Sequence, residues 1–183
     1  MPSSFELALR RAAAHGVPVT ARGGGTSQAG QSIGAGLVVD TSKYLNRVLA
    51  IDPDARTARV EPGLVLDDLN AALRPHGLRF APDVSSSSRA TVGGMMANNS
   101  SGARSVIYGK TGDHVATQRV VLADGSAATL QPLAGAGPVD QVDRTLLEHP
   151  GADARQDVVG TAPFQDHRVD AGPVQELAEQ QAR

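Results

Sequence analysis

Two glycine-rich segments contain the residues of this chain that are best suited to bind a charged ligand. The first, residues 20–27, reads TARGGGTS and follows the short run VPV at 17–19. Successive glycines leave backbone amides unshielded by any Cβ, and such amides can surround an anion. The second, residues 90–102, reads ATVGGMMANNSSG and adds hydroxyl and amide side chains. We expect the two segments to hold the two ends of one large ligand; a mobile glycine turn is the alternative for the first.

Other motifs that bind nucleotides or supply nucleophiles are incomplete or stand in the wrong structural context. The dinucleotide fingerprint would need glycine in place of Gln28, and the Walker pattern would need glycine in place of Arg104. Residues 30–34 match the G-x-S-x-G of a hydrolase nucleophile elbow around Ser32. That motif follows a strand and opens a helix, whereas here it follows a loop and leads into the apolar run at 37–39. A serine hydrolase that uses Ser32 stays an alternative.

The composition limits the class of protein. The chain has 183 residues and a net charge of −2 with acids and bases interspersed, which gives no footprint for nucleic acid. It has no cysteine, and its five histidines form no pair at ligand spacing, so we expect no disulfide and no metal. No apolar run approaches the ~20 residues of a membrane span, and the first residues do not resemble a secretory signal. We expect a cytoplasmic protein.

Capping residues and hydrophobic periodicity predict a mixture of helices and strands. Ser3 and Glu6 match a capping box at the start of a helix that ends at Gly16. Glycine and proline clusters separate the later elements. The further elements that we expect are strands at 17–21 and 37–40, a hairpin at 47–51 and 57–61, a helix at 66–73, and a hairpin at 120–123 and 126–130.

At the two glycine-rich segments the chain resembles the FAD-linked oxidase family. This group shares the p-cresol methylhydroxylase or vanillyl-alcohol oxidase type of flavin domain. Within it, the motifs are most similar to those of D-2-hydroxy-acid dehydrogenases of the D-lactate, glycolate and 2-hydroxyglutarate types. The similarity extends over residues 5–131 in order. The motifs that carry it are VPVTARGGGTS at 17–27, EPG at 61–63, APD at 81–83, ATVGGMMANNSSG at 90–102, YGKTGDHV at 108–115 and VLADG at 121–125.

The resemblance implies an α+β fold in which FAD lies between two α+β subdomains. The first segment would hold the pyrophosphate through backbone amides, with Gly24 at positive φ, and the second would line the opposite side of the flavin. FAD is expected to be non-covalent, because Thr26 stands where relatives with attached flavin have histidine. The residues predicted to bind FAD are Arg22, Gly23, Gly24, Gly25, Thr26, Ser27, Gln31, Ser32, Pro82, Asp83, Thr91, Gly93, Gly94, Asn98, Ser100, Ser101, Gly102, Gly109, Thr111 and Asp113.

Some of these residues also have a purely structural interpretation. Asn98, Ser100 and Ser101 are suited to cap a turn within their own segment. The motif residues Gly109, Thr111 and Asp113 are typical of a loop that fixes the approach to the strand at 116–123, and this role is their alternative to a direct contact with FAD.

The resemblance also predicts what the chain lacks. We expect a partial FAD-binding domain at 1–131, incomplete at both ends, and a peripheral extension at 132–183 that is partly disordered or forms short helices at 142–148 and 174–180. Relatives have further strands before the first helix and a substrate domain after the flavin domain. A missing substrate domain or partner subunit is therefore expected, and so is self-association. No catalytic residue is identified.

The function implied by the resemblance is the FAD-binding part of a flavin-dependent oxidoreductase. Such an enzyme oxidises a D-2-hydroxy acid, a small-molecule substrate, to the 2-oxo acid by hydride transfer to flavin N5. The alternative is a non-catalytic remnant or nucleotide-binding module with the same fold.

Overall fold

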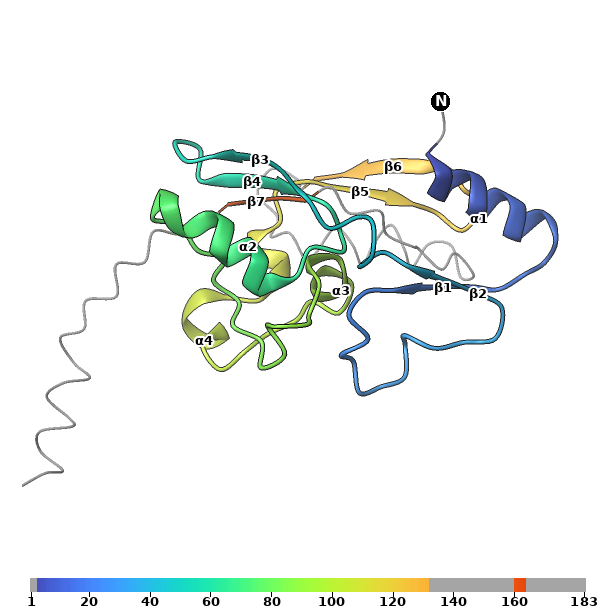
Figure 1. Ribbon diagram of the computed structural model, residues 1–183, viewed down its shortest axis with the longest axis horizontal. Coiled ribbons are helices and arrows are strands. Elements are labelled where there is room, and N and C mark those ends of the chain that lie inside the picture. The colour runs from blue at the N-terminus through green and yellow to red at the C-terminus, as the bar shows by residue number, and fades with distance from the viewer. Residues whose placement is uncertain (1–2, 132–159, 164–183) are drawn as a thin grey trace, which may run out of the picture.

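The computed structural model describes residues 3–131 and 160–163 of the chain (Figure 1). Short helices and strands of similar number make up this part, which confirms the α+β class. The elements are α1 Ser4–Ala14, β1 Val19–Arg22, β2 Leu37–Asp40, β3 Val48–Asp52, β4 Thr57–Val60, α2 Leu66–Leu73, the 3₁₀ helix Arg74–His76, α3 Val92–Ala97, α4 Ser105–Tyr108, the 3₁₀ helix Thr111–His114, β5 Gln118–Val121, β6 Ala127–Leu130 and β7 Gly160–Pro163.

Helix α1 begins and ends where the sequence predicts. The Ser3 hydroxyl accepts the Glu6 amide at 3.2 Å, and the Glu6 carboxylate accepts the Ser3 amide at 3.0 Å, which completes the capping box. Gly16 follows the helix with φ +63°, a conformation that glycine adopts at little cost. The capping box and the C-terminal glycine are therefore confirmed.

The strands form small sheets instead of one continuous sheet. β1 and β2 pair in parallel, with Val19 opposite Leu37. β3 and β4 form the predicted antiparallel hairpin, and β5 and β6 form the other. Because β1 and β2 are parallel and adjacent, residues 23–36 must cross from the end of one strand back to the start of the other. The first glycine-rich segment lies at the carboxyl end of β1 for this reason.

Two separate hydrophobic cores hold these elements. In the first, Phe5, Leu9 and Ala12 of α1 pack against Val19 of β1 and Val121 of β5. The second core joins β4, α2 and α3, and its buried members are Ala58, Val60, Leu64, Leu66, Leu69, Leu73, Leu78, Phe80, Ala90, Val92 and Met95. This division agrees with the predicted arrangement in two α+β subdomains. α3 lies near the middle of the molecule, between the two groups of elements (Figure 1).

The structure corrects the sequence prediction in the second glycine-rich segment. No helix was predicted within residues 90–102, which had the glycine content of a loop, but residues Val92–Ala97 form α3. The Thr91 hydroxyl accepts the Gly94 amide at 3.4 Å at the start of this helix. Buried packing of Val92 and Met95 outweighs the low helix propensity of two adjacent glycines.

Four further elements were not predicted, one of them the 3₁₀ helix Arg74–His76 that follows α2. The others are α4, the 3₁₀ helix Thr111–His114, and β7, which pairs antiparallel with β4. The expected short helices at 142–148 and 174–180 lie outside the described residues.

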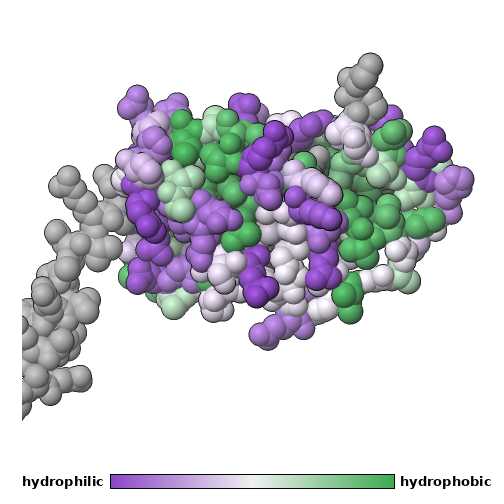
Figure 2. Space-filling view, viewed as in Figure 1, coloured by the Kyte–Doolittle hydropathy of each residue, from purple (hydrophilic) through white to green (hydrophobic). Residues whose placement is uncertain are grey.

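Apolar side chains are exposed on the parallel pair of strands. Leu37 and Val38 of β2 are 40% and 41% exposed, and Val17 before β1 is 40% exposed. The space-filling view shows apolar surface at the end of the molecule where α1, β1 and β2 lie (Figure 2). Parallel strands are usually covered on both faces, so this face is less covered than is typical. Separately, no helix of residues 3–131 has the length and apolar character that a membrane span requires.

Candidate functional site

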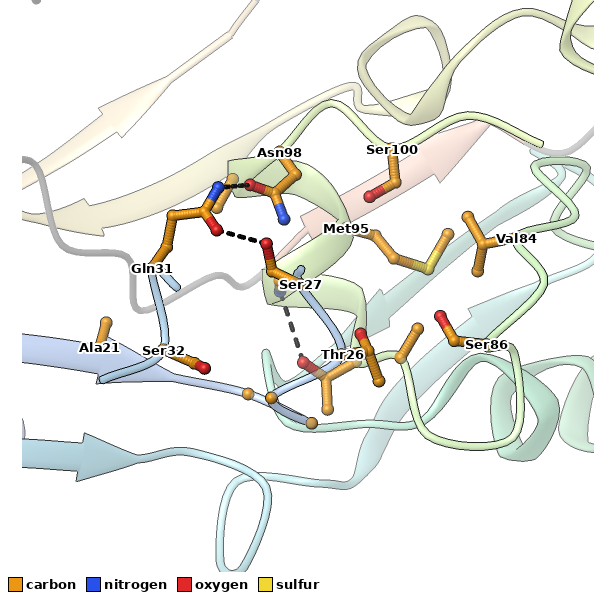
Figure 3. Close-up of a pocket in the computed structure, with 17 residues that line it drawn as sticks. Ala21, Thr26, Ser27, Gln31, Ser32, Val84, Ser86, Met95, Asn98 and Ser100 are labelled. Carbon is orange, nitrogen blue, oxygen red and sulfur yellow. Dashed lines mark hydrogen bonds between the residues drawn. The ribbon is translucent and has the colours of Figure 1, made fainter. Parts of the chain in front are cut away.

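The two glycine-rich segments meet at a pocket (Figure 3). Its volume is about 130 Å³, below the roughly 300–1,000 Å³ of a pocket that encloses a drug-sized ligand. It would therefore hold part of a dinucleotide. The lining residues are Ala21, Gly23, Gly24, Gly25, Thr26, Ser27, Gln31, Ser32, Val84, Ser86, Ala90, Thr91, Gly94, Met95, Ala97, Asn98 and Ser100.

The structure brings together one part of the predicted site and leaves the other part outside the pocket. The predicted residues that line it are Gly23, Gly24, Gly25, Thr26, Ser27, Gln31, Ser32, Thr91, Gly94, Asn98 and Ser100. Those that do not line it are Arg22, Pro82, Asp83, Gly93, Ser101, Gly102, Gly109, Thr111 and Asp113. Most of these non-lining residues are within a few positions of a lining residue in the sequence. The exceptions are Gly109, Thr111 and Asp113.

Close packing fixes the start of the first segment against the second. A Cβ on Gly23 would overlap with the Thr91 hydroxyl, and a Cβ on Gly24 would overlap with the backbone carbonyl of Arg89. The expected positive φ at Gly24 is wrong: Gly25 has φ +65°, and Gly24 lies outside the positive range. Gly24 is required because another stretch of backbone passes directly over it, whereas the left-handed turn comes one residue later.

Beyond this contact the first segment presents unused hydrogen-bond donors. Among the hydrogen bonds of the described residues, none has a backbone amide of residues 24–27 as its donor. The guanidinium of Arg22 lies against Gly25, since a Cβ there would be 2.8 Å from Nη2. Arg22 takes part in none of the ion pairs formed by residues 3–131. Amides and a cation that have no partner among the described residues are a donor set that suits a phosphate or diphosphate group.

Side-chain amides connect the far end of the first segment to the second. The Ser27 hydroxyl donates to Oε1 of Gln31, and Nε2 of Gln31 donates to Oδ1 of Asn98 at 3.5 Å (Figure 3). This is the one hydrogen bond among the described residues that joins residues 22–32 to residues 90–102. The pocket therefore lies between a close backbone contact on one side and a weak polar contact on the other.

The second segment is anchored from behind by the turn that precedes α2. The Leu66 amide donates to the Ala90 carbonyl at 3.0 Å, and the Val92 amide donates to the Leu64 carbonyl at 2.9 Å. Gly93 donates its amide to the Pro62 carbonyl at 2.8 Å, and a Cβ on Gly93 would lie only 2.7 Å from Pro62 Cβ. Gly93 is therefore needed for packing inside the protein, whereas Gly94 faces the pocket.

A charged pair supports the turn that contacts Gly93. The buried Glu61 carboxylate accepts the Arg47 amide at 2.8 Å and the Arg47 Nη2 at 2.7 Å. Hydrogen bonding by Arg47 lowers the pKa of Glu61 below its ordinary value. The pair fixes the EPG motif at 61–63, which the sequence identified only as part of the resemblance.

The APD motif also supports the site from outside the pocket. Asp83 accepts the Arg104 amide at 3.2 Å and lies 3.5 Å from Arg104 Nε. A Cβ on Gly102 would overlap with the Asp83 carbonyl. The residues in this region that line the pocket are Val84 and Ser86, just after the predicted Pro82 and Asp83.

Sequence reasoning missed six residues that line the pocket: Ala21, Val84, Ser86, Ala90, Met95 and Ala97. Three of them, Ala90, Met95 and Ala97, belong to the second segment, and their apolar side chains did not suggest a ligand contact. A helical reading of residues 92–97 would have placed Met95 and Asn98, three positions apart, on one face.

The donor set of the pocket fits the phosphate part of FAD. Residues 24–27 provide amides without acceptors in the described part of the chain, and Thr26, Ser27 and Ser32 provide hydroxyls. Asn98 and Ser100 provide polar groups on the opposite wall. Apolar Val84 and Met95 also line the pocket, as expected beside an aromatic ring system.

Known proteins place this arrangement in a family. A family model described as an FAD binding domain matches residues 3–131. The chain is 48% identical over 141 residues to a D-2-hydroxyglutarate dehydrogenase of Pseudomonas putida, covering 72% of this chain and 14% of that protein. It is 47% identical over 114 residues to the D-2-hydroxyglutarate dehydrogenase of Escherichia coli, covering 62% of this chain and 11% of that protein. The chain thus spans about a seventh or less of the length of these relatives.

A solved structure supports the fold. An alkyldihydroxyacetonephosphate synthase superposes with a TM-score of 0.68 at 24% identity, over 87% of this chain and 31% of that one. At this identity the similarity concerns the fold alone. It agrees with the expected flavin-domain architecture, and the match over residues 3–131 confirms FAD as the cofactor. The chain belongs to the FAD binding domain family of the FAD-linked oxidoreductases.

Proposed function

We propose that this chain supplies the FAD site of a flavin-dependent oxidoreductase that oxidises a D-2-hydroxy acid to the corresponding 2-oxo acid. The substrate class comes from the relatives, whose names are those of D-2-hydroxyglutarate dehydrogenases. Since the chain spans only 14% of the length of the first of them, the substrate and the whole reaction belong to the proposal. A cytoplasmic location is also part of it.

One observation carries the cofactor assignment. The amides of residues 24–27 donate to no group among the described residues, and they open into a pocket whose other wall carries Asn98 and Ser100. Unused amides with an arginine beside them favour a diphosphate ligand, because charge-assisted hydrogen bonds are about twice as strong as neutral ones. The polar and apolar groups of the opposite wall suit the flavin half of FAD.

The residues of the chain would bind and orient the cofactor. Residues 24–27 would donate to the pyrophosphate oxygens while Arg22 compensates their charge, and Asn98 and Ser100 would bond to the ribityl chain or to the polar edge of the ring. When bound, FAD would supply the hydride acceptor of the oxidation. No residue of the described part has a geometry that identifies it as the catalytic base, which we assign to a substrate domain or partner subunit.

Titration of the purified chain with FAD tests the cofactor proposal. Binding should quench flavin fluorescence, and an excess of ADP should compete because it carries the same diphosphate. Because Thr26 offers no usual attachment point, acid precipitation should release the flavin into the supernatant. Colour that stays with the precipitated protein would contradict non-covalent binding, and absence of any FAD binding would contradict the proposed site.

Turnover measurements separate an enzyme from a binding module. The isolated chain should bind FAD weakly, associate with itself through exposed apolar surface such as Leu37 and Val38, and show no oxidation of D-lactate, glycolate or D-2-hydroxyglutarate with an artificial acceptor. Turnover by this chain alone would place the catalytic residues within it. Loss of association on Val38→Lys, measured by light scattering, would identify β2 as part of the contact.

A further inference from the structure

The YGKTGDHV motif contributes no side chain to the pocket. Gly109, Thr111 and Asp113 were predicted to contact FAD, but none of them is among the lining residues. Thr111 is completely buried. Thr111 bonds to Ser100, and the next residue, Gly112, bonds to Asn99. Asn98 and Ser100, on either side of Asn99, both line the pocket. The motif therefore lies directly behind one wall of the site.

We propose that Thr111 and Asn99 are positioning residues, which hold Asn98 and Ser100 in the geometry that binds the flavin half of the cofactor. This inference rests on the proposed function, since it concerns the same pocket. The YGKTGDHV motif would then act on cofactor binding by holding residues 98–100 in place, without contact with the cofactor.

The contacts of Thr111 converge on one carbonyl. The Thr111 hydroxyl donates to the Ser100 carbonyl at 2.8 Å, and the Thr111 amide donates to the same oxygen at 3.0 Å. On its other side, the Ser100 amide donates to the Met95 carbonyl at 2.8 Å. The backbone of Ser100 is thus held between α3 and the 3₁₀ helix Thr111–His114, and its side chain is left to face the pocket.

Asn99 adds a second connection and a conformational requirement. Its side-chain oxygen accepts the Gly112 amide at 2.9 Å. Its φ is +45°, in the left-handed region that asparagine tolerates better than most residues. Asn98 and Ser100 lie on either side of this turn, so a change of φ at Asn99 would reorient both. The bond to Gly112 stabilises the required turn.

The rest of the motif keeps the 3₁₀ helix in place. The Lys110 amide donates to Oδ2 of Asp113 at 2.7 Å. That carboxylate covers Gly109, where a Cβ would lie 2.5 Å from Oδ2 and where φ is +78°. Each predicted motif residue is therefore accounted for by a contact that fixes Thr111 and Gly112 against residues 99 and 100.

Conservative variants of the full chain test the inference. Thr111→Val removes the hydroxyl but keeps the volume and the amide bond, so Ser100 keeps one donor and no buried group is left unpaired. Asn99→Gly keeps access to positive φ and removes the acceptor for Gly112. Thr111→Ser keeps the hydroxyl donor and Asn99→Asp keeps the side-chain acceptor, so both variants should bind FAD as the wild type does. Thr57→Val, at a half-buried β4 threonine whose side chain has no hydrogen bond among the described residues, is the matched control.

Two readouts separate positioning from general stability. The first is the affinity for FAD compared with that for ADP, which reaches only the diphosphate part of the site. The second is amide hydrogen exchange of residues 98–100 without ligand. Thr111→Val and Asn99→Gly should each weaken FAD binding roughly fivefold to tenfold, as for one lost hydrogen bond, and leave ADP binding within about twofold. Residues 98–100 should exchange faster, and the double variant should lose less than the product of the single effects.

Several results would overturn the inference. Equal weakening of FAD and ADP binding would indicate a general loss of structure. If Thr111→Val binds FAD with wild-type affinity, Thr111 is not a positioning residue, whether or not amide exchange of residues 98–100 becomes faster. If the wild-type chain binds no FAD, the proposed function fails, and unchanged exchange of residues 98–100 in Thr111→Val would then reject the positioning role separately.

Discussion

The two walls of the pocket are built in opposite ways. The first segment, residues 22–32, is largely exposed and leaves the amides of residues 24–27 without acceptors among the described residues. The second segment, residues 90–102, begins at buried residues and is fastened to the turn before α2 and to the 3₁₀ helix Thr111–His114. The first segment therefore has backbone amides available to a ligand, whereas backbone amides of the second segment, such as those of Val92 and Gly93, donate to other parts of the protein.

Because the two segments differ in this way, glycines in similar sequence contexts have different roles. Gly24 and Gly93 both lie where added atoms would meet backbone or proline, but Gly24 also lines the pocket while Gly93 does not. A substitution in the first segment should therefore change ligand affinity most, and a substitution in the second should change stability most.

The largest effect is expected for Gly24→Val. Its side chain would overlap with the Arg89 carbonyl, so the first segment must move away and its amides lose their common orientation. FAD affinity should fall by more than about a hundredfold, since several charge-assisted bonds of about 1.5–3 kcal/mol each are affected. Gly30→Ala is the control: no atom lies within 4 Å of its Cβ, and only its φ of +79° is strained. Unchanged fluorescence titration of Gly24→Val would remove this segment from the site.

Gly93→Ala should destabilise the fold of the ligand-free chain at the second wall of the pocket. The new Cβ would lie 2.7 Å from Pro62 Cβ and 2.9 Å from the Pro62 carbonyl oxygen. Overpacking of this kind costs about 1–3 kcal/mol, which chemical denaturation of the ligand-free chain would measure. Gly94→Ala, whose nearest neighbour is the Thr91 hydroxyl at 3.2 Å, should stay within about 0.5 kcal/mol because alanine favours helix. Equal stability of the two variants would contradict the packing role of Gly93.

Glu61→Gln should weaken the support of the second wall and change its response to acid. The variant loses the charge that Arg47 pairs with, and the loss of stability should be modest because Arg47 is largely exposed and solvent screens the pair. The pKa of Glu61 is lowered from its ordinary value of 4.5. Its contribution is therefore complete above pH 4.5 and is lost as the pH falls through the lower folded value. Denaturation at several pH values should show a smaller acid loss in the variant than in the wild type.

Thr26→Ala should produce the smallest effect and refine the role of the first wall. Its hydroxyl has no acceptor or donor among the hydrogen bonds of the described residues, so its removal should not alter the stability of the free chain. If the hydroxyl donates to a phosphate, FAD and ADP affinities should both fall about threefold to tenfold. A decrease for FAD alone would place Thr26 near the flavin instead of the diphosphate.

Local sequence signals determined much of the fold. The capping box at Ser3 and Glu6, the left-handed Gly16, and the hairpins β3–β4 and β5–β6 are all set by interactions between residues close in the chain. Patterns of this kind are readable because capping and turn formation depend on residue type at short spacing. The motif series also determined the family and the cofactor, which the match over residues 3–131 confirms.

Tertiary contacts decided which residues of those motifs face the pocket. Nothing in the glycine runs reveals that Arg89 passes over Gly24, that Pro62 covers Gly93, or that Thr111 fastens to Ser100. Helix α3 likewise forms over two glycines because Val92 and Met95 become buried. This burial outweighs the unfavourable helix propensity of the two glycines. Most of these contacts join residues far apart in the chain. Residue type indicated an anion site and the resemblance of the motifs identified the ligand, whereas only the folded backbone separated the residues that face the ligand from those that hold them in place.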